Sequence, residues 1–146
     1  MDLMPAPGPD RTAYVADWIE IRTLTAVSGA SFDACDCDGY AATFTADGEM
    51  WLDAERLSAG RDELAKLPAK PRGFVHVTTD PIIELDGCTA TQRCTLLLYR
   101  RSRDGSKVSL FSTGRYEDRL VRTDDGWRFA RRHGWLDINT TAVTGS

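Results

Sequence analysis

The chain has 146 residues, of which 42% are hydrophobic and 27% are charged, and its formal net charge is −4. This length suits one domain with one core, and the composition is that of a water-soluble globular protein. A net negative charge opposes binding to polyanions, and no apolar run approaches the roughly 20 residues that cross a bilayer, so we expect neither nucleic acid nor a membrane as a partner. We expect a cytoplasmic protein.

The first ten residues are expected to form a flexible leader. They include three prolines, and they lack the basic start and the apolar core of a secretory signal. Residues 11–146 are expected to form one domain, because no repeat and no linker interrupts them. The four cysteines are too few and too irregularly spaced for a disulfide scaffold or a zinc site, so we expect reduced thiols and no metal.

The first predicted element is a helix that begins at Arg11 and ends near Gly29. Asp10 precedes it and can cap the free amides of the first turn. The residues expected to face the core recur at helical spacing, and they are Tyr14, Val15, Trp18, Ile19, Ile21, Leu24 and Thr25.

Three shorter elements are predicted next. A second helix is expected over residues 36–45, where the dipeptide Asp47-Gly48 stops it. A short strand is expected over residues 49–52, and a third short helix over residues 60–67.

The rest of the chain has the two-residue alternation of strands. Four runs are predicted, at residues 74–79, 89–101, 107–121 and 127–134, and Asp-Gly turn signals separate them. Helices followed by hairpin-linked strands predict an α+β domain with the helices on one face of a mostly antiparallel sheet. Long strands favour strong curvature, and a curved sheet roofed by helices encloses a cone-shaped pocket.

Asp33 and His76 are the candidate catalytic pair. Asp33 follows the first predicted helix, whereas His76 lies in a β-branched strand on the same face as Phe74. A carboxylate that binds one imidazole nitrogen fixes the tautomer and leaves the other nitrogen to accept a proton. A lone strand histidine is more often structural, however, and Asp33 is equally well explained as a residue that binds backbone amides.

Several segments, in their order and spacing, resemble the SnoaL-like branch of the NTF2-like superfamily, whose members include scytalone dehydratase, polyketide cyclases and a dehydrochlorinase. The matching positions cover nearly the whole chain after Arg11, and they are Leu24, Asp33, Asp36, Tyr40, Phe44, Asp47-Gly48 and the segments 74–77, 114–120 and 126–129. The resemblance implies a cone-shaped α+β barrel that needs no metal or organic cofactor and forms a homodimer or a larger homo-oligomer. It also implies that Asp33 orients or ionises His76.

Two positions depart from this resemblance. Several dehydratases carry a tyrosine five positions before the acid, where this chain has Ser28. Scytalone dehydratase carries one just before the acid, where this chain has Phe32. A phenol that could hold a carbonyl oxygen is missing from both places, so a mechanism that relies on it does not carry over.

Phe32, Trp51, Phe74 and Tyr116 are the expected substrate-binding residues. Trp51 could line a pocket for a flat polycyclic ligand. Tyr116 is favoured over Arg115 as a donor to an oxyanion, because a phenol provides a hydrogen bond without burying a charge. Alternation does not decide which of the two faces inward, and a bulge would reverse the choice.

Two surface features are also predicted. Arg128 and Arg132 are expected to face solvent as ion-pair partners of Glu117 or Asp118, although one of them could hold an anionic substrate. The apolar run at residues 96–98 is expected on an open sheet face, where it predicts a homodimer.

The predicted function is that of a cofactor-independent lyase or cyclase, with a dehydration as the first choice. It would act on a hydrophobic, carbonyl-bearing small molecule, with His76 as the general base or acid and Asp33 as its orienting partner. The alternatives are a binding or assembly module without turnover, an isomerase, and an epoxide hydrolase, because a fold does not fix a function.

Overall fold

The computed structural model describes residues 10–138, so the predicted leader, apart from Asp10, lies outside the described residues. The elements in chain order are α1 (Arg11–Asp33), α2 (Cys37–Ala42), β1 (Phe44–Leu52), β2 (Glu55–Ala59), α3 (Arg61–Lys66), β3 (Phe74–Asp86), β4 (Thr89–Arg101), β5 (Val108–Thr123) and β6 (Gly126–Leu136). Among these residues no helix is both long and apolar enough to cross a membrane.

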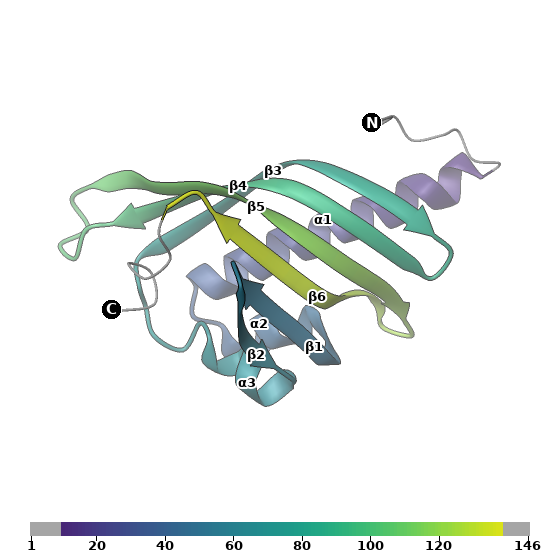
Figure 1. Ribbon diagram of the computed structural model, residues 1–146, viewed down its shortest axis with the longest axis horizontal. Coiled ribbons are helices and arrows are strands. Elements are labelled where there is room, and N and C mark those ends of the chain that lie inside the picture. Colours follow the sequence, from purple (N-terminus) through teal and green to yellow (C-terminus); the bar gives the residue numbers. More distant parts are fainter. Residues whose placement is uncertain (1–9, 139–146) are drawn as a thin grey trace.

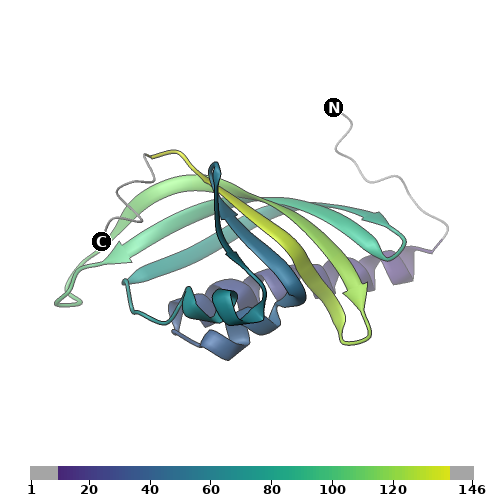
Figure 2. The same ribbon diagram turned by 60° about the horizontal axis from the view of Figure 1, so that its bottom comes forward.

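The six strands form one curved, unclosed sheet in the order β2-β1-β6-β5-β4-β3 (Figure 1). All neighbouring strands are antiparallel except β1 and β6, which run parallel. The sheet arches over the three helices, which all lie on its concave side (Figure 2). The predicted α+β architecture is confirmed, with helices on one face of a mostly antiparallel sheet.

Helix α1 is longer than predicted. Asp10 caps it, with its side chain accepting from the amide of Ala13 at 3.0 Å. The helix continues past Gly29 to Asp33, where the amide of Cys35 bonds to the carbonyl of Phe32 in a left-handed C-terminal motif. Cys35 provides the positive φ of +57° that glycine usually supplies there.

Two residues of the predicted apolar stripe on α1 do not reach the core. Val15 is 50% exposed and Ile19 is 55% exposed, whereas Ile21 and Leu24 are buried against the sheet. The prediction for Val15 and Ile19 was wrong, because the sheet covers a narrower stripe of the helix than the full apolar set.

The segment after α2 differs most from the prediction. The second helix ends at Ala42, and β1 already begins at Phe44 and runs through Asp47-Gly48. A Cβ on Gly48 would lie 2.8 Å from Cβ of Phe44 and 3.0 Å from the carbonyl oxygen of Phe129. Glycine therefore serves close packing inside a strand at this point, where a helix stop was predicted. Strand β2 was not predicted.

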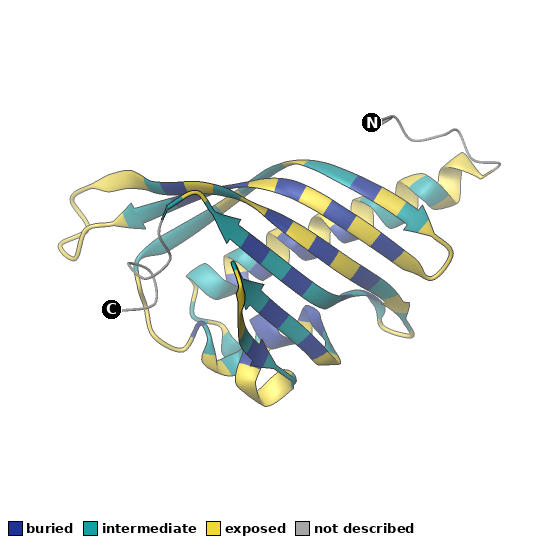
Figure 3. Ribbon diagram, viewed as in Figure 1, coloured by how far each residue is buried: buried dark blue, intermediate teal, exposed yellow. Residues whose placement is uncertain are grey.

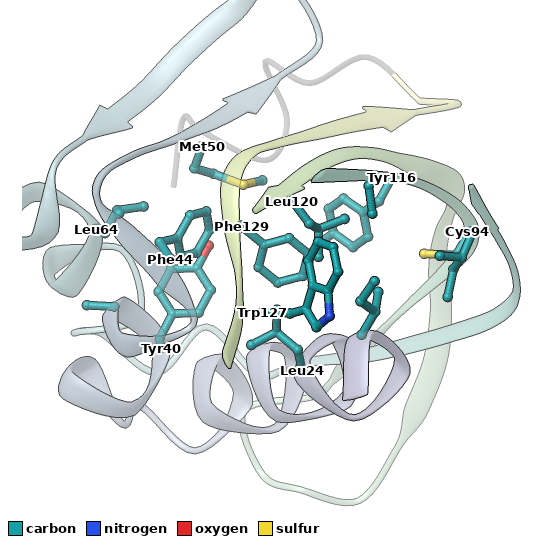
Figure 4. Close-up of a cluster of buried hydrophobic side chains, with 14 of the residues drawn as sticks. Leu24, Tyr40, Phe44, Met50, Leu64, Cys94, Tyr116, Leu120, Trp127 and Phe129 are labelled. Carbon is teal, nitrogen blue, oxygen red and sulfur yellow. The ribbon is translucent and has the colours of Figure 1, made fainter. Parts of the chain in front are cut away.

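The core lies between the sheet and the helices. Buried and exposed residues alternate along β4 and β5, so that one face of each strand packs inward (Figure 3). Aromatic side chains of β1, β5 and β6 fill the space above α1 (Figure 4). Leu96 and Leu98 belong to this interior, and only Leu97 of that run faces outward, which corrects the predicted apolar sheet surface.

Candidate active site

The structure brings Asp33 and His76 into direct contact. Oδ1 of Asp33 lies 2.6 Å from Nδ1 of His76, and Oδ2 accepts a hydrogen bond of 2.9 Å from the backbone amide of the same residue. One carboxylate thus fixes both the main chain and the ring of His76. The predicted meeting of a helix end with the sheet occurs across 43 positions of sequence.

Asp33 occupies an electrostatically unfavourable place, because it ends α1. Carboxylates are destabilised near the negative end of the helix dipole by about 0.3–1 kcal/mol at exposed positions. The two N–H donors of His76 offset this cost. A locally unfavourable residue that is compensated by one specific partner is typical of a functional site.

The ring of His76 is held in one orientation. Because the Asp33 carboxylate accepts at Nδ1, that nitrogen carries a proton, and in the neutral imidazole the lone pair is then on Nε2. Nε2 makes no hydrogen bond among residues 10–138. The ring of Phe32 packs edge-on against the imidazole with centroids 5.0 Å apart. Gly29 of α1 lies opposite His76, and a Cβ there would lie 3.4 Å from Cβ of His76. His76 is thereby set up to accept a proton at Nε2.

His76 lines a cavity of about 100 Å³ on the concave side of the sheet. Its apolar lining consists of Gly29, Phe32, Met50, Leu52, Leu57, Leu67, Phe74, Leu96, Leu98 and Leu136. Its polar lining consists of Ser28, Tyr40, Arg72, His76, Tyr116 and Arg132. A mostly apolar cavity with a few convergent polar groups is the usual form of a small-molecule site.

Arg132 faces into this cavity, and the prediction that it faces solvent was wrong. Arg119 pairs with Arg131 and Leu120 pairs with Phe129, so Ala130 is an extra residue in β6 without a partner on β5. This bulge reverses the alternation, and Arg132 is 3% exposed. Only its predicted pairing with Asp118 is right.

A buried polar network surrounds the Arg132 guanidinium. Its Nε lies 3.3 Å from Oδ1 of Asp118, and its Cζ lies 3.7 Å from the ring centroid of Tyr116. Gln92 donates to Oδ2 of Asp118 at 2.9 Å. Burial nevertheless raises the pKa of Asp118 to about 6, and Nη2 of Arg132 has no hydrogen-bond partner among the described residues.

Two phenols reach the cavity from other elements than the resemblance implied. Tyr40 comes from α2 and Tyr116 from β5, while Ser28 and Phe32 occupy the places of the missing tyrosines. Burial raises the pKa of Tyr116 to about 12 and also raises the pKa of Tyr40. Both phenols therefore stay protonated, and neither makes a hydrogen bond within residues 10–138, so both can donate to a ligand.

The predicted binding residues divide into two groups. Phe32, Phe74 and Tyr116 line the cavity, and the inward choice of Tyr116 over the exposed Arg115 agrees with the structure. Trp51 does not line it, because Met50 and Leu52 on the same strand face inward. The Trp51 ring instead packs against Arg131, whose Cζ lies 4.6 Å from the centroid. Trp51 is thereby removed from the candidate site.

Sequence reasoning assigned neither Tyr40 nor Ser28 to the site, and it named Arg132 only as an alternative that could hold an anionic substrate. Tyr40 was predicted only as part of a helical apolar cluster, and its polar end gives no separate signal in the sequence. The four cysteines are free thiols, and no group of three or more His, Cys, Asp or Glu side chains in residues 10–138 could hold a metal.

A curved sheet over three helices, with an aspartate–histidine contact at the wall of an apolar cavity, defines an α+β protein with a candidate site for a small molecule. A family model described as a SnoaL-like domain matches residues 13–133. The chain therefore belongs to the SnoaL-like family, within the NTF2-like fold.

Solved structures agree with this assignment. A Mycobacterium tuberculosis protein of unknown function is similar over 94% of this chain and 80% of its own, with 28% identity and a TM-score of 0.80. An NTF2-like protein with a cystatin-like fold from Novosphingobium aromaticivorans is similar over 94% of this chain and 97% of its own, with 24% identity and a TM-score of 0.76. ActVI-ORFA from Streptomyces coelicolor is similar over 82% of this chain and 97% of its own, with 21% identity and a TM-score of 0.72. Comparison with curated proteins found no match.

Proposed function

We propose that this protein is a cofactor-independent lyase or cyclase that abstracts a proton next to a carbonyl group, with dehydration as the reaction. One observation carries the proposal: Asp33 binds Nδ1 of His76 while the imidazole lines an apolar cavity. This arrangement provides a general base whose tautomer is fixed and whose reactive nitrogen faces a ligand space.

The chemical step uses one base and three hydrogen-bond donors that line the cavity. Nε2 of His76 takes a proton from the carbon next to the carbonyl, and the electron pair of the broken C–H bond moves toward the carbonyl oxygen. Arg132, Tyr40 and Tyr116 supply hydrogen-bond donors for the resulting oxyanion. When the C=C bond forms, the β-hydroxyl group leaves and takes a proton from the imidazolium, which releases water and restores neutral His76.

The size of the cavity limits the reacting part of the substrate. An apolar cavity of roughly 150 Å³ can bind benzene. A volume of about 100 Å³ is smaller than that and therefore suits a group more compact than one ring, such as the carbonyl-bearing end of a substrate. The rest of a larger substrate would extend through the cavity mouth.

A comparison of the two histidines of the chain tests the proposal. A panel of cyclic β-hydroxy ketones is incubated with the protein, and formation of the conjugated enone is followed by ultraviolet absorbance. His76→Gln should lower turnover about 100- to 10,000-fold, the usual contribution of general-base catalysis. His133→Gln is the matched control, because His133 does not line the cavity. Equal turnover in both variants contradicts the proposal.

A further inference from the structure

A second, strongly cationic hollow lies next to the cavity. This hollow has a volume of about 1090 Å³ and lies between the segment before β3 and the β4–β5 hairpin, which projects beyond the helices (Figure 1). Six basic residues line it, and together we name them the cationic mouth: Lys70, Arg72, Arg100, Arg101, Arg103 and Lys107. No acidic residue lines it.

The charges of the cationic mouth are not neutralised by carboxylates within the described chain. None of the six basic residues forms a salt bridge with another residue of 10–138. Asp104 is the carboxylate in the same hairpin turn, and its hydrogen bonds with Ser102 and Ser106 lower its pKa to about 2, so it stays ionised. The hairpin turn thus adds one carboxylate near six cations, in a chain whose formal net charge is −4. This concentration of positive charge is suited to an anionic ligand.

The two hollows lie next to each other and share one lining residue. Arg72 lines both of them. Phe74 of the cavity and Phe111 of the cationic mouth pack edge-on, with centroids 5.2 Å apart, and the Arg100 guanidinium lies 5.4 Å from the first ring and 5.7 Å from the second. A single molecule can therefore have its apolar end beside His76 and its anionic end among the arginines.

We infer that the substrate carries a phosphate-bearing tail, which binds in the cationic mouth while the carbonyl end enters the cavity. This inference rests on the proposed function for the carbonyl end, but the tail site is defined by charge alone. Guanidinium groups bind phosphate through paired N–H donors, and four of the six basic residues are arginines. Phe74 and His76 are two positions apart on β3, which places the tail roughly 7 Å or more from the reacting carbon.

A pair of ligands that differ only in the phosphate tests the inference. The phosphate ester of 4-(3-hydroxypropyl)acetophenone is compared with the parent alcohol by isothermal titration calorimetry in 50 mM salt. We expect the phosphate ester to bind at least tenfold more tightly. The difference should shrink strongly in 500 mM salt, where exposed charges are screened.

Variants locate the site. Arg101→Gln/Arg103→Gln/Lys107→Gln should remove most of the preference for the phosphate ester. Arg11→Gln/Arg61→Gln is the control, because both residues are exposed and neither lines the cationic mouth. Equal affinity for the two ligands, no binding of either, or an equal loss in both sets of variants overturns the inference.

Two further measurements distinguish a failure of the proposed reaction, and binding to a membrane surface, from a failure of the tail site. Binding is measured without turnover, so His76→Gln should keep the phosphate preference even if the proposed reaction is wrong. Vesicles with 30 mol% phosphatidylglycerol test a membrane surface as the partner. Vesicle binding that depends on the hairpin cations, without preference for the phosphate ester, overturns the substrate-tail inference.

Discussion

Asp33 and His76 show how far single residues can be interpreted from a sequence. Both were predicted as a pair because the resemblance gave them a geometry that spacing alone did not. Arg132 was misplaced, because the bulge at Ala130 has no marker in the sequence, and a one-residue shift moves a side chain to the other face of a strand. The face on which a side chain lies can thus be predicted where the alternation is regular, but it cannot be predicted beyond a bulge.

Gly134 provides a test at the residue scale of how the cavity wall is packed. A Cβ at this position would lie 3.1 Å from Cε1 of Tyr116 and 3.4 Å from Cδ1 of Leu52. We expect Gly134→Ala to lower the free energy of unfolding by about 1–3 kcal/mol, because the Tyr116 ring must move. Urea denaturation measures the change.

Gly29 supplies the comparison for that measurement. A Cβ on Gly29 would make an ordinary contact of 3.4 Å, and alanine is favoured over glycine inside a helix by about 1 kcal/mol. Gly29→Ala should therefore be neutral or stabilising. A Gly134→Ala variant as stable as Gly29→Ala contradicts the described packing of Tyr116.

Asp118 predicts a specific dependence of stability on pH. Burial raises its pKa from 3.8 to about 6, so the folded state holds a proton between these values that the unfolded state has released. The stabilising contribution of this proton is present at low pH and is lost as the pH rises toward 6. Between pH 4 and pH 6, the free energy of unfolding of the native protein should fall relative to that of Asp118→Asn, and the difference should be constant above that range. Parallel curves from pH 4 to pH 7 would contradict the raised pKa.

At the scale of elements, α1 contacts both His76 of the candidate site and the start of β6. Its last residue binds His76, and its first half binds β6: Asp17 accepts from Nε1 of Trp127 at 3.0 Å, and Glu20 accepts from the Trp127 amide at 2.8 Å. Trp127 is fully buried. The helix therefore links the edge strand β3 to β6 in the interior of the sheet.

Removal of one of these contacts tests the role of α1. Asp17→Ala leaves the buried indole N–H of Trp127 without a partner and also removes the ion pair of Asp17 with the half-exposed Arg122. The lost partner of the indole should cost about 1–3 kcal/mol in the free energy of unfolding, and the exposed ion pair contributes at most about 1 kcal/mol. Asp47→Ala is the control, because Asp47 is exposed and accepts only from the nearby Thr45 hydroxyl. If thermal denaturation shows the same small change for both variants, Trp127 is not held as described.

The sequence predicted β4 and β5 better than the other elements, and β3 runs to Asp86, beyond its predicted end at residue 79. The long strands β4 and β5 lie within two residues of their predicted ends, since alternation over a dozen residues is a strong signal. The end of α1 was missed because Cys35, where glycine is usual, takes the left-handed conformation. The start of β1 was missed because Gly48 serves close packing inside the strand.

For the whole molecule, homodimerisation stays a prediction. The outer sheet face carries Leu97 and Val77, the latter 39% exposed, beside a hollow lined by Arg93, Glu117 and Arg131. Charges of both signs beside an apolar strip are compatible with a self-complementary interface. Light scattering at micromolar concentration should give twice the monomer mass, and a constant monomer mass up to high concentration would contradict this.

The fold places an imidazole and hydrogen-bond donors on one concave side of the sheet, and the cationic mouth lies next to them. Each group comes from a different element: His76 from β3, Tyr116 from β5 and Arg132 from β6. A β-sheet that curves around its helices is what brings them together. The central claim that follows is that Nε2 of His76 removes a proton from carbon inside this cavity.

Proton exchange tests that claim most directly, because it needs no knowledge of the natural substrate. Acetophenone has one ring, one carbonyl and an adjacent methyl group, and the exchange of its methyl protons for deuterium in D₂O can be followed by proton NMR. The native protein should accelerate the exchange, and His76→Gln and Asp33→Asn should each lose at least 100-fold of that acceleration, whereas His133→Gln keeps it. No acceleration by the native protein, or equal exchange in all variants, would contradict the account.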